Sequence, residues 1–226
     1  MIVTKIEAVA KNKYKVYLDE RFAFVLYKGE LSRYRVTVNE ELSVEMYVKI
    51  RREVILKRGK LRALHLLNVM GRTEEQLRQK LRLGSYPEDI IDMVMDYVKS
   101  FGYINDQEYA RNFIESRKDK KSRREIYASL CQKGVKSEDI DAAFQECYEE
   151  HDAREAICTL LRKKGYDPEN ADRAETQKIL GFLVRKGFRY EDIRQVIQVS
   201  DWNAFSGSYP FLRRSVQIAS LASCSS

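Results

Sequence analysis

The sequence predicts a mainly α protein, in which three-helix repeats form an elongated, curved array behind a small N-terminal antiparallel β meander. Three observations lead to this prediction. The chain of 226 residues has only 10 glycines and 3 prolines, with 33% charged residues, which is typical of helices joined by short turns rather than of a sandwich or barrel. Residues 2–27 alternate apolar and polar side chains, and later segments have helical spacing and repeat themselves.

Residues 1–43 are expected to form the β-rich extension. Between residues 2 and 27, three alternating runs are separated by turns at 11–13 and 19–21, which predicts a three-stranded antiparallel meander. A sheet this small is marginal alone, so we expect it to pack on the helix that follows Ser43. Residues 28–42 fit either a short helix or a further extended segment, and the pattern does not decide between them.

The first helical module is predicted at residues 44–104. An apolar stripe that starts at Val44 indicates a helix, which Gly59 is expected to interrupt before the stripe resumes toward Val69. Thr73 is the predicted N-cap of a short second helix. A third helix begins near Pro87, and its apolar face is expected to run as far as Phe101.

The second module is predicted at residues 105–150 and the third at 151–199. Asn105 with Glu108, and Ser122 with Glu125, have the spacing of capping boxes and indicate two helix starts in the second module. The following 200–226 segment is rich in serine and keeps no clean apolar period, so we expect a poorly ordered tail.

The modules are recognisable because their second halves repeat. The second copy contains Ile126, Leu130, Gly134, Glu138, Asp139 and Ile140, and the third contains Ile179, Leu183, Gly187, Glu191, Asp192 and Ile193 at the same spacing. The first copy contains Leu77, Leu81, Gly84, Glu88, Asp89 and Ile90, and it matches the spacing of the second copy once one residue is dropped. In each copy we expect a helix to end at a glycine with positive φ and an acidic pair to begin the next helix.

Basic side chains are the main candidates for binding. The chain has 41 Lys and Arg against 34 Asp and Glu, a net charge of +7, which favours a polyanion or an acidic protein surface as partner. The candidates form three clusters: Arg51, Arg52, Lys57, Arg58, Lys60 and Arg62; Arg117, Lys118, Lys120, Lys121, Arg123 and Arg124; and Arg162, Lys163 and Lys164. The clusters would form one stripe along stacked modules, or else are solvated helix ends that complement helix dipoles.

Aromatic residues near the module junctions leave two interpretations open. They are Tyr103, Tyr127, Tyr148, Tyr166 and Tyr190. Tyrosines at helix junctions usually pack the ring and leave the hydroxyl in water, which is the reading we favour. Stacking on nucleic-acid bases is the alternative.

The residues offer little to catalysis. There is no phosphate-binding glycine loop, nucleophile elbow or HExxH motif, and His65 and His151 have no finger spacing to a cysteine, so no cofactor or metal site is expected. The repeated acidic pairs would serve a metal-dependent nuclease, but their position at helix starts favours dipole complementation. The four cysteines have no paired spacing, and neither a signal peptide nor a membrane span is apparent, which indicates reduced thiols in a cytoplasmic protein.

The chain resembles the RecX regulatory proteins of bacteria from about Leu61 to Gln198. The resemblance is carried by residues 71–81, by 126–134, and above all by 101–117, FGYINDQEYARNFIESR. It implies a tandem three-helix-repeat protein, without catalytic residues, that binds the RecA recombinase filament and modulates its ATPase, coprotease and strand-exchange activities, usually by inhibition. It also implies some affinity for single- and double-stranded DNA. We expect a monomer.

A different function is compatible with the same residues. The runner-up is a sequence-nonspecific DNA-binding repeat protein with no recombinase partner, in which phosphate contacts alone supply the affinity. If one segment contacts the filament, the sequence favours the basic elbow, residues 117–124.

Overall fold

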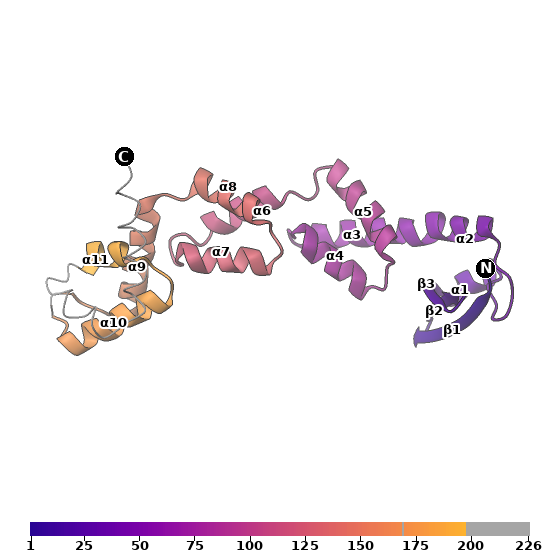
Figure 1. Cartoon of the computed structure of the whole chain (residues 1–226), viewed down its shortest axis with the longest axis horizontal. Coiled ribbons are helices and arrows are strands. Elements are labelled where there is room, and N and C mark those ends of the chain that lie inside the picture. Colours follow the sequence, from indigo (N-terminus) through magenta and orange to yellow (C-terminus); the bar gives the residue numbers. More distant parts are fainter. Residues whose placement is uncertain (169, 198–226) are drawn as a thin grey trace, which may run out of the picture. The chain divides into compact units, whose positions relative to one another are not determined.

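The computed structural model describes residues 1–168 and 170–197, and the serine-rich tail lies outside the described residues. A three-stranded sheet is followed by a succession of helices (Figure 1), so the predicted fold class is confirmed. The chain divides into two compact units. Unit 1 contains residues 1–112 and 130–143, and unit 2 contains residues 113–129 and the chain from Phe144 onward. The elongated, curved arrangement of the modules stays a prediction.

The N-terminal sheet has the strand order β1-β2-β3, with both neighbouring pairs antiparallel. Its strands are β1 (Val3–Ala10), β2 (Lys13–Leu18) and β3 (Arg21–Tyr27). Asp19 and Glu20 both have positive φ, 47° and 65°, which gives the β2–β3 hairpin a turn that matches the strand twist. Val16 pairs with Phe24 at the centre of the sheet, and both are fully buried. Residues 23–26 of β3 are all buried, so this strand is covered on both faces.

The ambiguous segment after the sheet begins as a short helix, α1 (Lys28–Arg33). The chain then returns as a loop along the open edge of β1. There, the Val3 N–H donates to the Glu40 carbonyl at 3.0 Å, and the Asn39 N–H donates to the Val3 carbonyl at 2.8 Å. These bonds cover the beginning of an otherwise unpaired strand edge.

A continuous helical segment follows, made of α2 (Val44–Ile50), the π-helical turn η1 (Arg51–Leu56) and α3 (Lys57–Val69). The sheet packs on this segment as predicted, with Phe24 5.9 Å from Tyr47 between ring centroids. The expected interruption at Gly59 was wrong. Gly59 lies inside α3, and a Cβ there would lie 2.9 Å from Val94 Cγ2, so the glycine allows α5 to approach closely.

The first module is completed by α4 (Glu74–Leu83) and α5 (Glu88–Ser100), which pack on each other and on α3. Thr73 forms the predicted capping box with Gln76 at the start of α4. Two other predictions were wrong. Gly84 has φ −76°, and its neighbour Ser85 has the positive φ of 59°. Phe101, expected in the core, is 60% exposed.

The second and third modules contain the remaining helices. They are α6 (Asp106–Glu115), α7 (Arg123–Gln132), α8 (Ser137–Cys147), α9 (Glu150–Lys164), α10 (Arg173–Arg185) and α11 (Tyr190–Ile197). Gly134 and Gly187 have φ of 81° and 88° at the predicted helix ends. The third module has its own core, in which Ile157, Leu183 and Ile193 are fully buried. Within the described residues, Cys131, Cys147 and Cys158 form no disulfide.

Within unit 1, the second module is attached to the first at the N-terminus of α4. The buried Thr73 hydroxyl donates to the Lys133 carbonyl at 2.5 Å while it also accepts from the Gln76 N–H. Glu75 packs on Gly134, where a Cβ would lie 2.8 Å from Glu75 Cγ. A glycine is therefore required for two reasons, its backbone conformation and the close approach of the preceding module.

Within unit 2, the third module is attached to the second in the same way. The buried Ser122 hydroxyl donates to the Lys186 carbonyl at 2.5 Å, and Arg124 packs on Gly187. The corresponding turn of the first module has its positive φ at Ser85 instead of at a glycine. We refer to the Thr73 and Ser122 contacts as the two module joints.

Candidate functional site

Two arginines of the first basic cluster are engaged inside unit 1. Arg51 forms an ion pair with Asp89 and donates to the Tyr47 hydroxyl at 2.7 Å. Arg58 donates to the Val25 carbonyl at 3.0 Å and to both oxygens of Glu30 at 2.5 Å. Both guanidinium groups therefore join the helices to neighbouring structure, and their charge is largely compensated.

Three other members of this cluster are exposed. They are Arg52 on η1 and Lys57 and Arg62 on α3, which we call the η1–α3 cations. Across the described parts of the chain, none of them forms an ion pair. Their charges are hydrated and unneutralised, so they can meet an anionic partner without breaking internal contacts.

Most cations of the basic elbow, residues 117–124, hold unit 2 together. Lys118 Nζ donates to the Cys147 carbonyl at 3.1 Å and lies 3.4 Å from the Asp152 carboxylate. Lys121 pairs with Glu125 at 2.8 Å. These cations fix the elbow to the helices that follow it, because the contacts reach α7, the last residue of α8, and α9.

The arginines of the elbow lie on aromatic rings or on the second module joint. Arg117 lies 3.8 Å from the Phe113 ring centroid, and Arg123 lies 4.7 Å from that of Phe144. Arg124 packs on Gly187 through its aliphatic carbons. Of the six elbow candidates, Lys120 is the one whose side chain contacts, within the described part of the chain, only its sequence neighbour Asp119.

The third cluster is the last turn of α9. Arg162 and Lys163 are exposed, and Lys164 lies 5.1 Å from the Phe182 ring centroid. Gly165 ends the helix in the left-handed conformation with φ 67°. These cations complement the negative end of the helix dipole, as expected for a helix end, and they are also open to an anionic partner.

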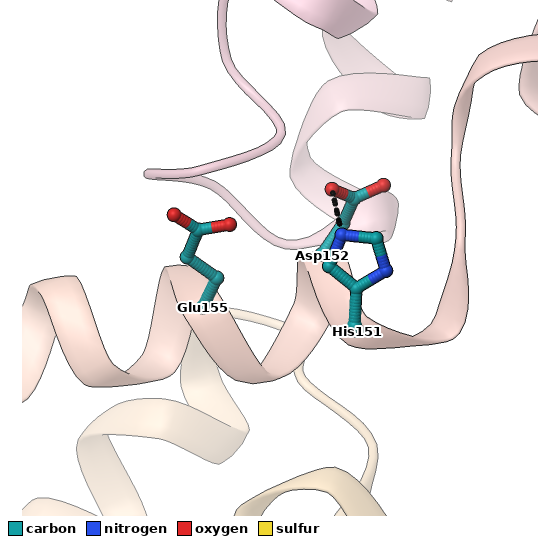
Figure 2. A group of neighbouring side chains, drawn as sticks. All are labelled: His151, Asp152 and Glu155. Atoms are coloured by element: carbon teal, nitrogen blue, oxygen red, sulfur yellow. Dashed lines mark ion pairs between the residues drawn. The ribbon is translucent and has the colours of Figure 1, made fainter.

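His151, Asp152 and Glu155 form the one group of potential metal ligands found among the described residues (Figure 2). Asp152 is 2% exposed and already has partners. It accepts from the Glu149 N–H at 2.7 Å, lies 3.6 Å from His151 Nε2 and pairs with Lys118. The carboxylate is thus a capping and ion-pairing group, and a metal ion would have to displace the Lys118 ammonium.

Three carboxylates of the acidic pairs at the helix starts are also paired with cations. Asp89 pairs with Arg51, and Glu88 accepts from Arg82 at 2.8 Å. In the third module, the buried Asp192 accepts from Arg189 at 3.0 Å. These three carboxylates are therefore engaged by cations within the protein, at helix starts where the dipole also favours negative charge.

The junction tyrosines divide into packed and exposed rings. Tyr166 is 7% exposed and shares a 3.0 Å hydrogen bond with Thr176. Burial, aided by the nearby carboxylates of Asp152 and Asp192, raises the pKa of Tyr148 to about 12, so its hydroxyl stays protonated. Tyr103, in contrast, is 53% exposed. The rings of the first two are packed as expected, but their hydroxyls are not left in water: that of Tyr166 bonds to Thr176, and that of Tyr148 is buried without a hydrogen-bond partner in the described residues. Base stacking stays a prediction for Tyr103.

No helix in the described residues has the length and apolar content needed to cross a membrane. Three family models match successive segments of the chain. Residues 60–97 match the first three-helix domain of RecX, 105–143 match the second and 152–197 match the third. The matched segments lie within the three predicted modules, in the same order, and include both module joints.

The chain is also similar to whole proteins of this kind. It is 30% identical to "Regulatory protein RecX" of Caldanaerobacter subterraneus subsp. tengcongensis, over 88% of this chain and 100% of the relative. It is 28% identical to "Regulatory protein RecX" of Clostridium botulinum, over 87% of this chain and 94% of the relative. A "Crystal structure of regulatory protein RecX" has a TM-score of 0.57 at 25% identity, covering 87% of this chain and 98% of that one. The structure of RecX from Lactobacillus salivarius has a TM-score of 0.54 at 25% identity, covering 63% and 94%.

Proposed function

Because the chain belongs to the RecX family of regulatory proteins, we propose that it binds the filament of the RecA recombinase on DNA and inhibits its ATPase, coprotease and strand-exchange activities. A regulator of a DNA-bound recombinase works in the cytoplasm, so that compartment is part of the proposal. We also propose that the protein acts as a monomer and without catalysis. The third module supports a monomer, because the N-cap of α10, the position that Thr73 and Ser122 occupy in α4 and α7, is the exposed Asp172, whose carboxylate cannot donate the joint hydrogen bond.

The observation that carries the proposal is the set of exposed, unpaired cations on a modular scaffold. The η1–α3 cations are available to phosphates of the filament DNA or to acidic side chains of RecA. Arg162 and Lys163 offer a second such point on the third module. Modules that contact several protomers of a filament would gain avidity from simultaneous weak contacts.

The test is the DNA-dependent ATPase rate of a bacterial RecA, measured on single-stranded DNA while the full chain is added at sub-stoichiometric ratios. The proposal predicts that the ATPase rate falls and that the protein co-sediments with the filament. An unchanged rate at every ratio, without co-sedimentation, would contradict it. Strand exchange measured in the same titration checks that the effect reaches recombination.

The second candidate is a DNA-binding protein without a recombinase partner, which the net charge of +7 also favours. The two candidates differ in how the presence of RecA on the DNA changes the affinity of the chain. For a plain DNA binder, affinity for naked DNA would equal that for the filament and would fall steeply with salt. For the proposed regulator, the filament is bound more tightly than naked DNA at the same salt concentration.

A further inference from the structure

Three aromatic rings at the C-terminus of α5 form a surface cluster, which we call the aromatic shelf: the half-buried Tyr97 and the exposed Phe101 and Tyr103. Tyr97 and Phe101 meet edge to face with ring centroids 5.0 Å apart, and Phe101 and Tyr103 stack at 5.8 Å with an interplanar angle of 18°. Phe101 is 60% exposed and Tyr103 is 53% exposed. The rings contact one another while leaving much of their surface to solvent.

The backbone fixes this exposure. Gly102 adopts φ 68° directly after Phe101, and its N–H donates to the Lys99 carbonyl at 2.9 Å. The Tyr103 N–H donates to the Val98 carbonyl at 3.0 Å, which closes the turn. A Cβ at Gly102 would have no neighbour within 4 Å, so the glycine serves the turn and not close packing. The turn therefore presents both rings outward instead of burying them beside Val98.

A positive charge accompanies the shelf. Lys60 Nζ, from α3, lies 4.2 Å from the Tyr97 ring centroid, and Lys57 is exposed one helical turn earlier. Asp96, the sequence neighbour of Tyr97, is exposed and would repel a phosphate. A ligand that places an apolar plane on the rings and an anion beside α3 suits this arrangement, and an unpaired nucleotide has both parts.

We propose that the aromatic shelf is a stacking site for unpaired bases of single-stranded DNA, with Lys60 and Lys57 placed beside the backbone phosphates. The inference rests on the proposed function and adds the ligand of one site to it. A purely apolar protein side chain suits the shelf less well, because covering the rings would also desolvate the Lys60 ammonium. Every base has a flat π face, so the site would bind without strong sequence preference.

The test uses the full chain and two fluorescently labelled oligonucleotides of about 16 nucleotides, one with normal bases and one abasic throughout. Both have the same phosphates, so their difference in affinity reports stacking. The variant replaces Phe101→Leu and Tyr103→Leu together, which keeps apolar volume and removes the π faces. We expect the variant to bind the normal oligonucleotide roughly 5- to 100-fold more weakly and the abasic one unchanged.

The matched control is Phe22→Leu, which replaces a 40% exposed ring on the N-terminal sheet and should leave both affinities unchanged. Thermal unfolding of each variant confirms that it is folded. Equal affinity of the unmodified chain for both oligonucleotides, or no binding to either at low salt, overturns the proposal. The proposal is also overturned if the double variant binds the normal oligonucleotide as tightly as the unmodified chain does. If that variant at the same time loses filament binding, the shelf contacts protein and not bases.

The failure of this inference is distinguishable from failure of the proposed function. If the rings bind bases but the chain leaves the RecA ATPase rate and filament sedimentation unchanged, the shelf stands and the RecA proposal fails. If the chain inhibits RecA but shows no dependence on bases, the RecA proposal stands and the shelf is overturned.

Discussion

The basic elbow and the η1–α3 cations look alike in sequence and differ in structure. In the elbow, Lys118 and Lys121 pair with carboxylates, while Arg124 packs on Gly187 at the second module joint. On η1 and α3, Arg52, Lys57 and Arg62 are exposed and unpaired in the described parts of the chain. The density of charge in a segment therefore does not indicate how much charge is available to a partner.

This comparison changes the expected binding surface. The sequence favoured the elbow as the segment that contacts the filament, but most of its cations already stabilise unit 2. Releasing Lys118 for a phosphate would leave the buried Asp152 carboxylate without its ammonium partner, which costs free energy. We therefore propose that the elbow is mainly structural and that the η1–α3 cations carry the binding. The predictions below test this division.

The largest loss of stability is expected at the second module joint, where Arg124 of the elbow packs on Gly187. Gly187→Ala would introduce a side chain at φ 88° and place its Cβ 3.0 Å from Arg124 Cβ and Cδ. We expect a loss of about 3 kcal/mol in the free energy of unfolding, from backbone strain and crowding together. Urea denaturation measures it.

Gly165→Ala is the matched control for Gly187→Ala. Gly165 has a similar positive φ of 67°, but a Cβ there would have no neighbour within 4 Å. Backbone strain alone predicts a loss of about 1 kcal/mol. Equal losses for the two variants would show that the Arg124 contact contributes nothing at the joint.

The next largest loss of stability is expected for a change at Asp152, which pairs with Lys118. Asp152→Ala removes the buried carboxylate that accepts from the Glu149 N–H and pairs with Lys118. We expect the free energy of unfolding to fall by about 2 kcal/mol, because a cap and an ion pair are lost together. Glu155→Ala, an exposed position on the same helix, should change it by less than about 0.5 kcal/mol. If Asp152→Ala also changed the free energy of unfolding by less than about 0.5 kcal/mol, the ion pair with Asp152 would not hold Lys118 in place.

The smallest effect is a difference in stability loss between two variants, and it separates the N-cap hydrogen bond from the joint hydrogen bond. Ser122→Ala removes both the N-cap bond to the Glu125 N–H and the joint bond to the Lys186 carbonyl. Ser43→Ala removes only an N-cap bond, from the Met46 N–H. We expect losses of about 2 and about 1 kcal/mol in thermal unfolding. Equal losses would mean that the joint hydrogen bond adds no stability.

Local patterns were sufficient for much of the fold. The alternation in residues 2–27 gave the three strands, and the capping pattern at Thr73 gave the start of α4. The glycine rule failed at Gly84, because a C-terminal turn needs one residue with positive φ and Ser85 supplies it. The expected deletion in the first repeat was therefore wrong. Ser85 and Gly134, the helix starts Glu88 and Ser137, and the buried Ile91 and Ile140 all lie 49 residues apart, so Ile91 and not Ile90 is the counterpart of Ile140.

The candidate site was harder to predict because its properties depend on contacts between residues distant in sequence. Nothing near Lys118 in the sequence shows that its ammonium group will pair with Asp152 and donate to the Cys147 carbonyl. Likewise, helical periodicity placed Phe101 on the core face of α5, although the helix ends one residue earlier and the chain turns at Gly102. Periodicity predicts burial only while the helix continues.

The central claim is that the η1–α3 cations, and not the elbow, meet the filament. Two triple variants test it: Arg52, Lys57 and Arg62 to Gln, and Arg117, Lys118 and Lys121 to Gln. The measurement is the affinity for a RecA filament on single-stranded DNA as a function of salt concentration. If the η1–α3 cations contact phosphates, the first variant should reduce the slope of log K against log salt by roughly 2, at about 0.7 per contact, while the second leaves it unchanged. An unchanged slope for the first variant with a reduced slope for the second would contradict the account.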